Sequence, residues 1–221
     1  ALAAGGALLQ GCSVNPATGE QSFTGFMSPE RERQIGAEEH PKLVKAFGGK
    51  YQDPALTRYL NGLGGLLQST SEQPKPPFTF TLLDTPVINA FALPGGYVYV
   101  SRGLMALAND EAELAGVVAH EIGHVTARHS AQRMSRGILA SLGAAVLGAV
   151  VGEPLLNDVA RLAAGAYIQG FSRDQEFEAD QLGVRYLTRA GFDPLAMSSF
   201  LGAMGAEHQL ALKIAGKEGQ D

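Results

Sequence analysis

The pentapeptide HEIGH at residues 120–124 constrains the fold and chemistry of this chain more than any other part of its sequence. Around it, in residues 109–134, apolar side chains recur at helical spacing and predict one long helix: Leu114, Val117, Val118, Ile122 and Val125. His120 and His124 are one helical turn apart and point the same way, so both imidazoles can reach one Zn²⁺ ion at about 2.0–2.1 Å. Glu121 lies beside this ligand line, where it can take a proton from a water molecule activated by the ion and pass it to a leaving amine.

A catalytic zinc site also needs a third protein ligand and an open position. The extended metzincin motif would place glycine and histidine where this chain has Ala127 and Ser130, so that class is excluded. The best candidate ligand is Glu176, on a helix predicted for residues 174–190. Asp180 lies one turn later and faces the same way, so it can hydrogen-bond a ligand histidine. The alternative for this acidic run is a solvated helix face, although apolar residues flank it.

Other ionisable residues near these motifs are not expected to bind the ion. His129 comes nine residues after His120, which on a continuous helix is close to the opposite face. It is therefore expected at the surface or behind the ligands. Glu178 is expected to point away from the two neighbouring carboxylates, and His40, in another predicted helix, is expected to face solvent.

Residues 78–101 change from helical to strand periodicity. Phenylalanine and leucine alternate with threonine in residues 78–83, which predicts a half-buried strand. Residues 87–104 predict two further strands around a Pro94-Gly95-Gly96 turn. This hairpin is either purely structural or offers an edge that pairs with the main chain of an extended peptide, and periodicity leaves both open.

Three further segments are predicted to be helical. Residues 28–47 and 53–67 each begin with an N-cap followed by proline. Residues 137–152 form a long uncharged stretch, which is shorter than the ~20 apolar residues of a membrane-spanning helix. We therefore expect a soluble helix near the active site, whose glycines and alanines suit close packing or a mobile flap over the cleft.

The N-terminal stretch ALAAGGALLQGCSVNP is interpreted as the end of a secretory signal. Leu9-Gln10-Gly11-Cys12 resembles a bacterial lipobox, so Cys12 is expected to become the lipidated first residue of a mature envelope lipoprotein. An ordinary free thiol is the alternative. The polar, turn-rich residues 13–26 predict a tether. Residues 1–27 are thus expected to hold the signal remnant, lipidation site and tether, and residues 28–221 a single zinc metallopeptidase domain.

HEIGH together with SRDQEFEAD at residues 172–180 resembles the zinc metallopeptidases of family 48, the group of HtpX and the CAAX prenyl proteases. CSVNPATGEQ, from residue 12, resembles the start of the bacterial envelope lipoprotein branch of this family. The resemblance implies an α+β fold: a mostly helical, gluzincin-like domain with a small β-sheet next to the metal helix. It also implies one Zn²⁺ per chain and the following roles: His120, His124 and Glu176 as ligands, Glu121 as base, Asp180 as orienter of a ligand histidine, and Asn89 and Ala90 near a substrate-aligning edge strand.

Members of this family usually add a histidine-proline segment with a downstream arginine, which the ending AEHQLALKIAGKEGQD, residues 206–221, does not contain. The C-terminal end of the domain is therefore expected to be truncated. The residue that stabilises the oxyanion opposite the ion is left unassigned.

The expected function is zinc-dependent hydrolysis of peptide bonds in extended or misfolded envelope proteins. The expected location is the periplasmic side of a bacterial envelope, with the chain lipid-anchored to the outer membrane through Cys12. One alternative is a holdase or assembly factor that binds unfolded proteins and rarely cleaves them. Another is a metal-stabilised structural domain, which would need four protein ligands. The net charge of −5 argues against nucleic acid as a partner, and the oligomeric state is not predicted.

Overall fold

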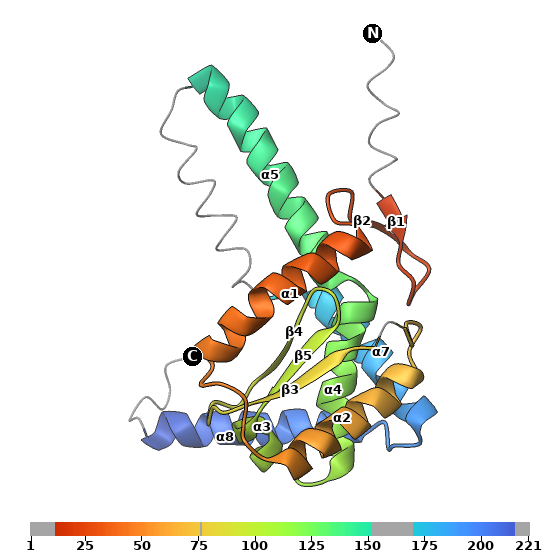
Figure 1. Ribbon diagram of the computed structural model, residues 1–221, viewed down its shortest axis with the longest axis vertical. Coiled ribbons are helices and arrows are strands. Elements are labelled where there is room, and N and C mark those ends of the chain that lie inside the picture. The colour runs from red at the N-terminus through yellow and green to blue at the C-terminus, as the bar shows by residue number, and fades with distance from the viewer. Residues whose placement is uncertain (1–11, 76, 152–169, 215–221) are drawn as a thin grey trace.

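The computed structural model describes residues 12–75, 77–151 and 170–214, and it has the predicted α+β fold, mostly helical with a small sheet (Figure 1). The described helices are α1 (Pro29–Ala46), α2 (Pro54–Ser69), α3 (Arg102–Leu107), α4 (Glu111–Thr126), α5 (His129–Val151), α7 (Arg173–Ala190) and α8 (Ala196–Ile214). The described strands are β1 (Cys12–Val14), β2 (Gln21–Phe23), β3 (Thr79–Leu83), β4 (Ala90–Leu93) and β5 (Tyr97–Ser101).

Local capping signals set the start of three helices. Ser28 and Asp53 cap α1 and α2 with side-chain oxygens that accept backbone N–H groups, and a proline follows each of them. Ser172 begins α7 in a capping box with Gln175, in which each side chain accepts a hydrogen bond from the backbone N–H of the other. The three helices predicted at these positions are therefore confirmed.

The larger sheet has the strand order β3-β5-β4, with β5 parallel to β3 and antiparallel to β4. The turn from β4 to β5 is the predicted one, and it needs glycine because Gly95 and Gly96 have φ angles of 84° and 90°. The three predicted strands are confirmed. β4 lies at an edge of this sheet, so one side of its backbone is not used for pairing with β5.

One hydrophobic core joins α2, the sheet, α4, α7 and α8, and α4 packs against α2, α7, α8 and β4. Its largest fully buried apolar side chains include Leu60 and Leu67 from α2, Ile122 from α4, Leu182, Tyr186 and Leu187 from α7, and Phe200 from α8. The helix that carries HEIGH therefore lies beside the small sheet, as the family resemblance implied.

Two glycines allow α4 and α7 to approach closely. A Cβ atom on Gly123 would lie 2.9 Å from the carbonyl oxygen of Ala179, and a Cβ on Gly183 would lie 3.1 Å from the backbone nitrogen of His120. The two helix backbones thus touch without an intervening side chain. This contact brings the carboxylates of α7 within reach of the histidines of α4.

The single helix predicted for residues 109–134 is wrong, because the chain leaves the helical path between α4 and α5. Arg128 adopts the left-handed conformation with φ of 58°, which is uncommon for a residue with a side chain. Its guanidinium forms an ion pair with Glu32 of α1 and donates a hydrogen bond of 2.6 Å to the carbonyl oxygen of Met27. These long-range contacts stabilise the interruption between α4 and α5. Neither glycine nor proline indicates this interruption in the sequence.

The helix predicted over residues 137–152 is confirmed as far as Val151, and Gly152 lies outside the described residues. In Figure 1, α5 extends away from the sheet. Ile138 and Leu139 are exposed, so residues 138–140 are not closely packed, and the flap over the cleft stays a prediction. Within the described ranges, every helix is too short or too polar to cross a membrane.

The tether predicted for residues 13–26 is instead a folded hairpin in which β1 and β2 pair antiparallel. Asn15 and Ala17, in the connection between the strands, are buried. The carbonyl oxygen of Ala17 accepts a hydrogen bond of 3.1 Å from Arg185 of α7. The polar composition suggested a linker because the contacts that order it lie far away in the sequence.

Candidate metal centre

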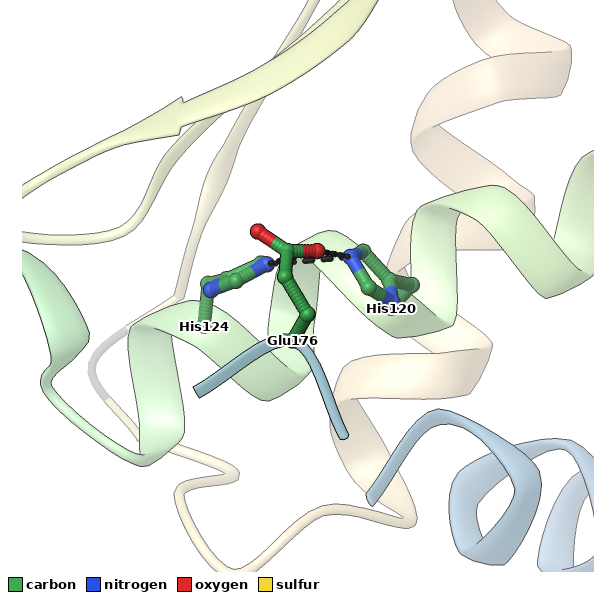
Figure 2. A group of neighbouring side chains, drawn as sticks. All are labelled: His120, His124 and Glu176. Carbon is green, nitrogen blue, oxygen red and sulfur yellow. Dashed lines mark hydrogen bonds and ion pairs between the residues drawn. The ribbon is translucent and has the colours of Figure 1, made fainter. Parts of the chain in front are cut away.

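His120 and His124 of α4 and Glu176 of α7 point toward one another (Figure 2). The Nε2 atoms of the two imidazoles are 2.9 Å apart. Oε2 of Glu176 lies 3.4 Å from Nε2 of His120 and 3.8 Å from Nε2 of His124. Among the described residues, these three form the group whose ligand atoms, all within 4.8 Å of one another, could hold a metal ion. The fold thus brings the three predicted ligands together.

The geometry of this group fits a divalent cation. Ligand atoms around a tetrahedral zinc ion are about 3.3–3.5 Å from one another, and the three distances above bracket this value. Nδ1 of His120 lies 2.9 Å from Oδ1 of Asp180, so a neutral His120 carries its proton on Nδ1 and leaves the lone pair of Nε2 for an ion. A cation between the two Nε2 atoms would be attracted by the lone pairs of both neutral rings. The two imidazoles and one carboxylate therefore suit Zn²⁺.

Burial and local contacts set the protonation of the site. Contacts with His120 and His124 hold the pKa of Glu176 well below its ordinary value, so this carboxylate is anionic. Burial lowers the pKa of His124 to about 4, which keeps the ring neutral at pH 7. Burial also raises the pKa of Glu121 to about 7, although His120 opposes this change. Anionic carboxylates and neutral imidazoles bind metal ions, and a carboxyl group that titrates near neutrality suits a general base.

The site lines a cavity of about 620 Å³ that also borders β4. Glu121 and the three ligands form part of its wall, together with Asn89 and all four residues of β4. A cavity of about 270 Å³ shares Asn89, Ala90, His120 and Glu121 with it. The rest of the smaller cavity is mostly apolar: Leu104, Val117, Met197, Phe200, Leu201 and Met204. Asn89 and Ala90 thus lie beside the candidate metal centre.

The sequence model of peptidase family M48 matches residues 54–213 of this chain. The chain belongs to peptidase family M48. The resemblance seen in its two motifs is therefore confirmed. Membership of this peptidase family implies a metal ion, typically zinc.

Relatives of this M48 peptidase include the beta-barrel assembly-enhancing protease of Escherichia coli (strain K12), which is 36% identical over 185 residues. That alignment covers 79% of this chain and 38% of the relative. The beta-barrel assembly-enhancing protease of Yersinia pestis is 36% identical over 187 residues, with the same coverage of 79% and 38%. The mitochondrial metalloendopeptidase OMA1 of Saccharomyces cerevisiae is 28% identical over 173 residues, which cover 75% of this chain and 46% of that protein. The chain spans just over a third of the length of the two bacterial relatives.

The M48 site has a buried neighbour, His129. Its Nδ1 lies 2.8 Å from Nδ1 of His124, and its Nε2 lies 3.1 Å from Oε2 of Glu178. His129 is expected either at the surface or behind the ligands, and the second position is confirmed. The break at Arg128 turns the chain so that His129 stays on the side of the ligands. Glu178 contacts His129, so it does not belong to a solvated helix face.

Aromatic contacts around this M48 site could not be predicted. Phe171 stacks on His124 with ring centroids 4.0 Å apart, and the guanidinium of Arg133 lies 4.4 Å from the centre of the Phe171 ring. A lone phenylalanine before a helix carries no motif that would indicate this contact. His40 is partly buried, with Nδ1 2.8 Å from the hydroxyl of Tyr99, so its expected exposure to solvent is wrong.

Proposed function

We propose that this chain is a zinc-dependent metalloendopeptidase of the gluzincin type, which hydrolyses peptide bonds in extended or misfolded proteins of a bacterial cell envelope. The observation that carries the proposal is that Glu121 lines the same cavity as His120, His124 and Glu176. An HExxH helix completed by a glutamate from another helix matches the two-histidine, one-glutamate sites of catalytic zinc proteins. One such group among the residues that the structure describes supports one Zn²⁺ per chain.

Each residue of the site has a role in this mechanism. A Zn²⁺ ion held by the three ligands would polarise the scissile carbonyl and acidify a water molecule beside it. Glu121 would take the proton of that water and deliver it to the leaving amine, and its pKa of about 7 suits both transfers. Asp180 fixes the ring of His120 through Nδ1, so that Nε2 stays directed at the site.

The cavity walls favour an extended polypeptide as substrate. β4 lies at the edge of the sheet and lines the cavity, so an extended peptide could pair with its main chain beside Glu121. Asn89 and Ala90, at the start of this edge, would align the peptide across the site. The adjoining apolar cavity suits a large apolar side chain of the substrate. Folded proteins keep such side chains buried, which favours unfolded or misfolded substrates.

The proposed location is the periplasmic side of the envelope, with a lipid anchor on Cys12 in the outer membrane. The lipobox-like residues before Cys12 support this proposal, and so do the bacterial relatives named for beta-barrel assembly. Because Cys12 is the first residue of β1, the anchor would attach directly to the folded hairpin. Mass spectrometry of the mature protein from its native cell tests this: a diacylglycerol thioether on Cys12 is expected, and an unmodified Cys12 behind an intact leader would contradict it.

The proposed activity is tested by comparing the wild type with Glu121→Gln on a permanently unfolded protein substrate. Glutamine keeps the size of the side chain but cannot act as the base, so cleavage should fall about 10²–10⁴-fold while zinc remains bound. His120→Ala and Glu176→Ala should instead lose zinc. Equal cleavage by the wild type and Glu121→Gln would exclude Glu121 as the base.

A second candidate function is a holdase or assembly factor that binds unfolded envelope proteins and rarely cleaves them. The bacterial relatives are named beta-barrel assembly-enhancing proteases, and these names support this second candidate. The same edge strand and cavity would bind the client. In the experiment above, retained substrate binding without cleavage by the wild type would support this alternative.

A further inference from the structure

A continuous series of side-chain contacts connects the candidate ligand His124 to the N-terminal hairpin. Nδ1 of His124 lies 2.8 Å from Nδ1 of His129, and Nε2 of His129 lies 3.1 Å from Oε2 of Glu178. The other carboxylate oxygen, Oε1, accepts a hydrogen bond of 2.7 Å from Nδ2 of Asn15. His124, His129 and Asn15 are buried, so water competes little for these contacts.

We propose that His129, Glu178 and Asn15 are positioning residues for His124, so that the N-terminal hairpin completes the support of the metal centre. Asn15 lies outside residues 54–213, the part that matches the family model, so the support of the site extends beyond the matched region. The proposal rests on the metal centre of the proposed function, but not on cleavage of any substrate.

With both imidazoles neutral, as metal binding requires of His124, the hydrogen-bond donors and acceptors in this series agree with one arrangement of protons. Glu178 can only accept when ionised, so His129 carries its proton on Nε2 and leaves Nδ1 as an acceptor. His124 must then donate from its own Nδ1, which leaves the lone pair of its Nε2 directed at Nε2 of His120. The carboxylate thus selects the metal-binding tautomer of His124 through His129.

The amide of Asn15 is itself fixed in orientation. Its Oδ1 accepts a hydrogen bond of 2.9 Å from the backbone N–H of Ala17, so its Nδ2 is the group left to face Glu178. A donor on the second carboxylate oxygen holds the rotamer of Glu178. The hairpin therefore supplies one correctly oriented donor at the end of the series.

The N-terminal part of the chain also fixes the backbone on which His129 lies. Arg128, in the left-handed conformation, is held by the side chain of Glu32 and the carbonyl oxygen of Met27. A continuous helix would carry His129 to the opposite face of α4, away from His124. The turn at Arg128 is thus what makes the contact between the two imidazoles possible.

The two candidate histidine ligands receive equivalent support from one helix. Asp180 accepts directly from Nδ1 of His120, whereas Glu178 reaches Nδ1 of His124 through the intervening ring of His129. Both carboxylates belong to α7, which also supplies Glu176. Carboxylates behind histidine ligands fix the ring orientation and raise ligand basicity.

The proposal is tested by measuring the Zn²⁺ dissociation constant of the full 221-residue chain by competition with a chromogenic chelator. Glutamine at position 129 offers one acceptor and one donor and can reproduce both contacts, whereas leucine of similar size can reproduce neither. His129→Leu should weaken zinc binding about 10–100-fold, and His129→Gln should stay within about threefold of the wild type. Glu178→Gln should weaken binding about tenfold.

The contribution of the hairpin is measured with Asn15→Ala, which should weaken zinc binding about 2–10-fold. Asn61→Ala is the matched control, because its amide donates to the Thr57 carbonyl within α2, and zinc binding should not change. Arg185→Ala removes another contact between the hairpin and α7 without touching Glu178, and it should also leave zinc binding unchanged. Absorption bands of the Co²⁺-loaded chain should shift in Asn15→Ala and Glu178→Gln but in neither control.

The outcomes separate this proposal from the proposed function. Equal loss in His129→Gln and His129→Leu, or an Asn15→Ala affinity equal to that of Asn61→Ala, would overturn it. If His129→Leu does not fold, the zinc dissociation constants of Glu178→Gln and Asn15→Ala test the proposal. A wild type that binds zinc but cleaves nothing would contradict the proposed peptidase activity and leave the positioning role intact. A wild type that binds no zinc would overturn both.

Discussion

Replacing Gly183 with alanine should disturb the metal centre without changing any polar group. The new Cβ would lie 3.1 Å from the backbone nitrogen and 3.2 Å from the Cα of His120. Both atoms belong to the backbone of α4, so a flexible side chain cannot move aside to make room. We expect α7 to shift by a few tenths of an ångström relative to α4, and Glu176 to shift with it.

The size of the effect follows from two opposing terms. Overpacking of a close backbone contact costs about 1–3 kcal/mol, and replacing a helical glycine with alanine returns about 1 kcal/mol. The matched control is Gly62→Ala in α2, where a Cβ would meet nothing within 4 Å and only the second term applies. Gly183→Ala should therefore be about 1–3 kcal/mol less stable than Gly62→Ala, or roughly 2–12 °C lower in Tm for a chain of this size.

Thermal unfolding by circular dichroism and the zinc dissociation constant would measure the two consequences. Gly62→Ala should unfold at or above the wild-type Tm and bind zinc normally. Gly183→Ala should unfold below Gly62→Ala and bind zinc more weakly than the wild type. Our account of the contact between α4 and α7 would be refuted if Gly183→Ala matched Gly62→Ala in both measurements.

Three further predictions concern stability. Tyr186→Phe removes the hydroxyl that bridges Glu72 at 2.6 Å and Thr126 at 2.8 Å, so it should cost about 1–3 kcal/mol in urea unfolding, whereas Tyr59→Phe near the surface should cost little. Burial acts to raise the pKa of Glu72, but hydrogen bonds from Tyr186 and the nearby arginines outweigh it and hold the pKa below its ordinary value of 4.5. Ionised Glu72 thus adds stability above pH 4.5, and this stability is lost as the pH falls through the pKa of the folded state. The difference in free energy of unfolding between the wild type and Glu72→Gln should therefore shrink as the pH is lowered. A difference that stays constant with pH would contradict this. Removal of zinc with a chelator should lower the Tm of the wild type but not that of His120→Ala, because only a chain that binds the ion gains stability from it.

Elements with local signals could be predicted from the sequence alone. The N-caps at Ser28 and Asp53, the alternation of β3 and the glycine turn before β5 all depend on neighbouring residues. The pairing of HEIGH with Glu176 could also be proposed, because metal ligands reveal themselves by residue type and spacing. In each case the chemistry of the short segment is enough to select its conformation.

The errors have one physical cause, which is that contacts distant in sequence overrode local preference. Arg128 has no intrinsic tendency to interrupt a helix, and its conformation depends on Glu32 and Met27 about a hundred residues earlier. The misplacement of His129 follows directly from that missed break. The N-terminal hairpin seemed to be a tether for the same reason, because its order comes from α7.

The candidate metal centre joins parts of the chain that are translated far apart. His120 and Asp180 are separated by 60 positions, and Asn15 and Glu178 by 163. A nascent polypeptide that has not yet reached α7 carries HEIGH without the carboxylate that should complete it, and a chain ending at Val151 is expected to show no tight zinc binding. If the chain is a peptidase as proposed, its ability to cut therefore arises only late in biosynthesis, and the machinery that produces it is not exposed to cleavage before then.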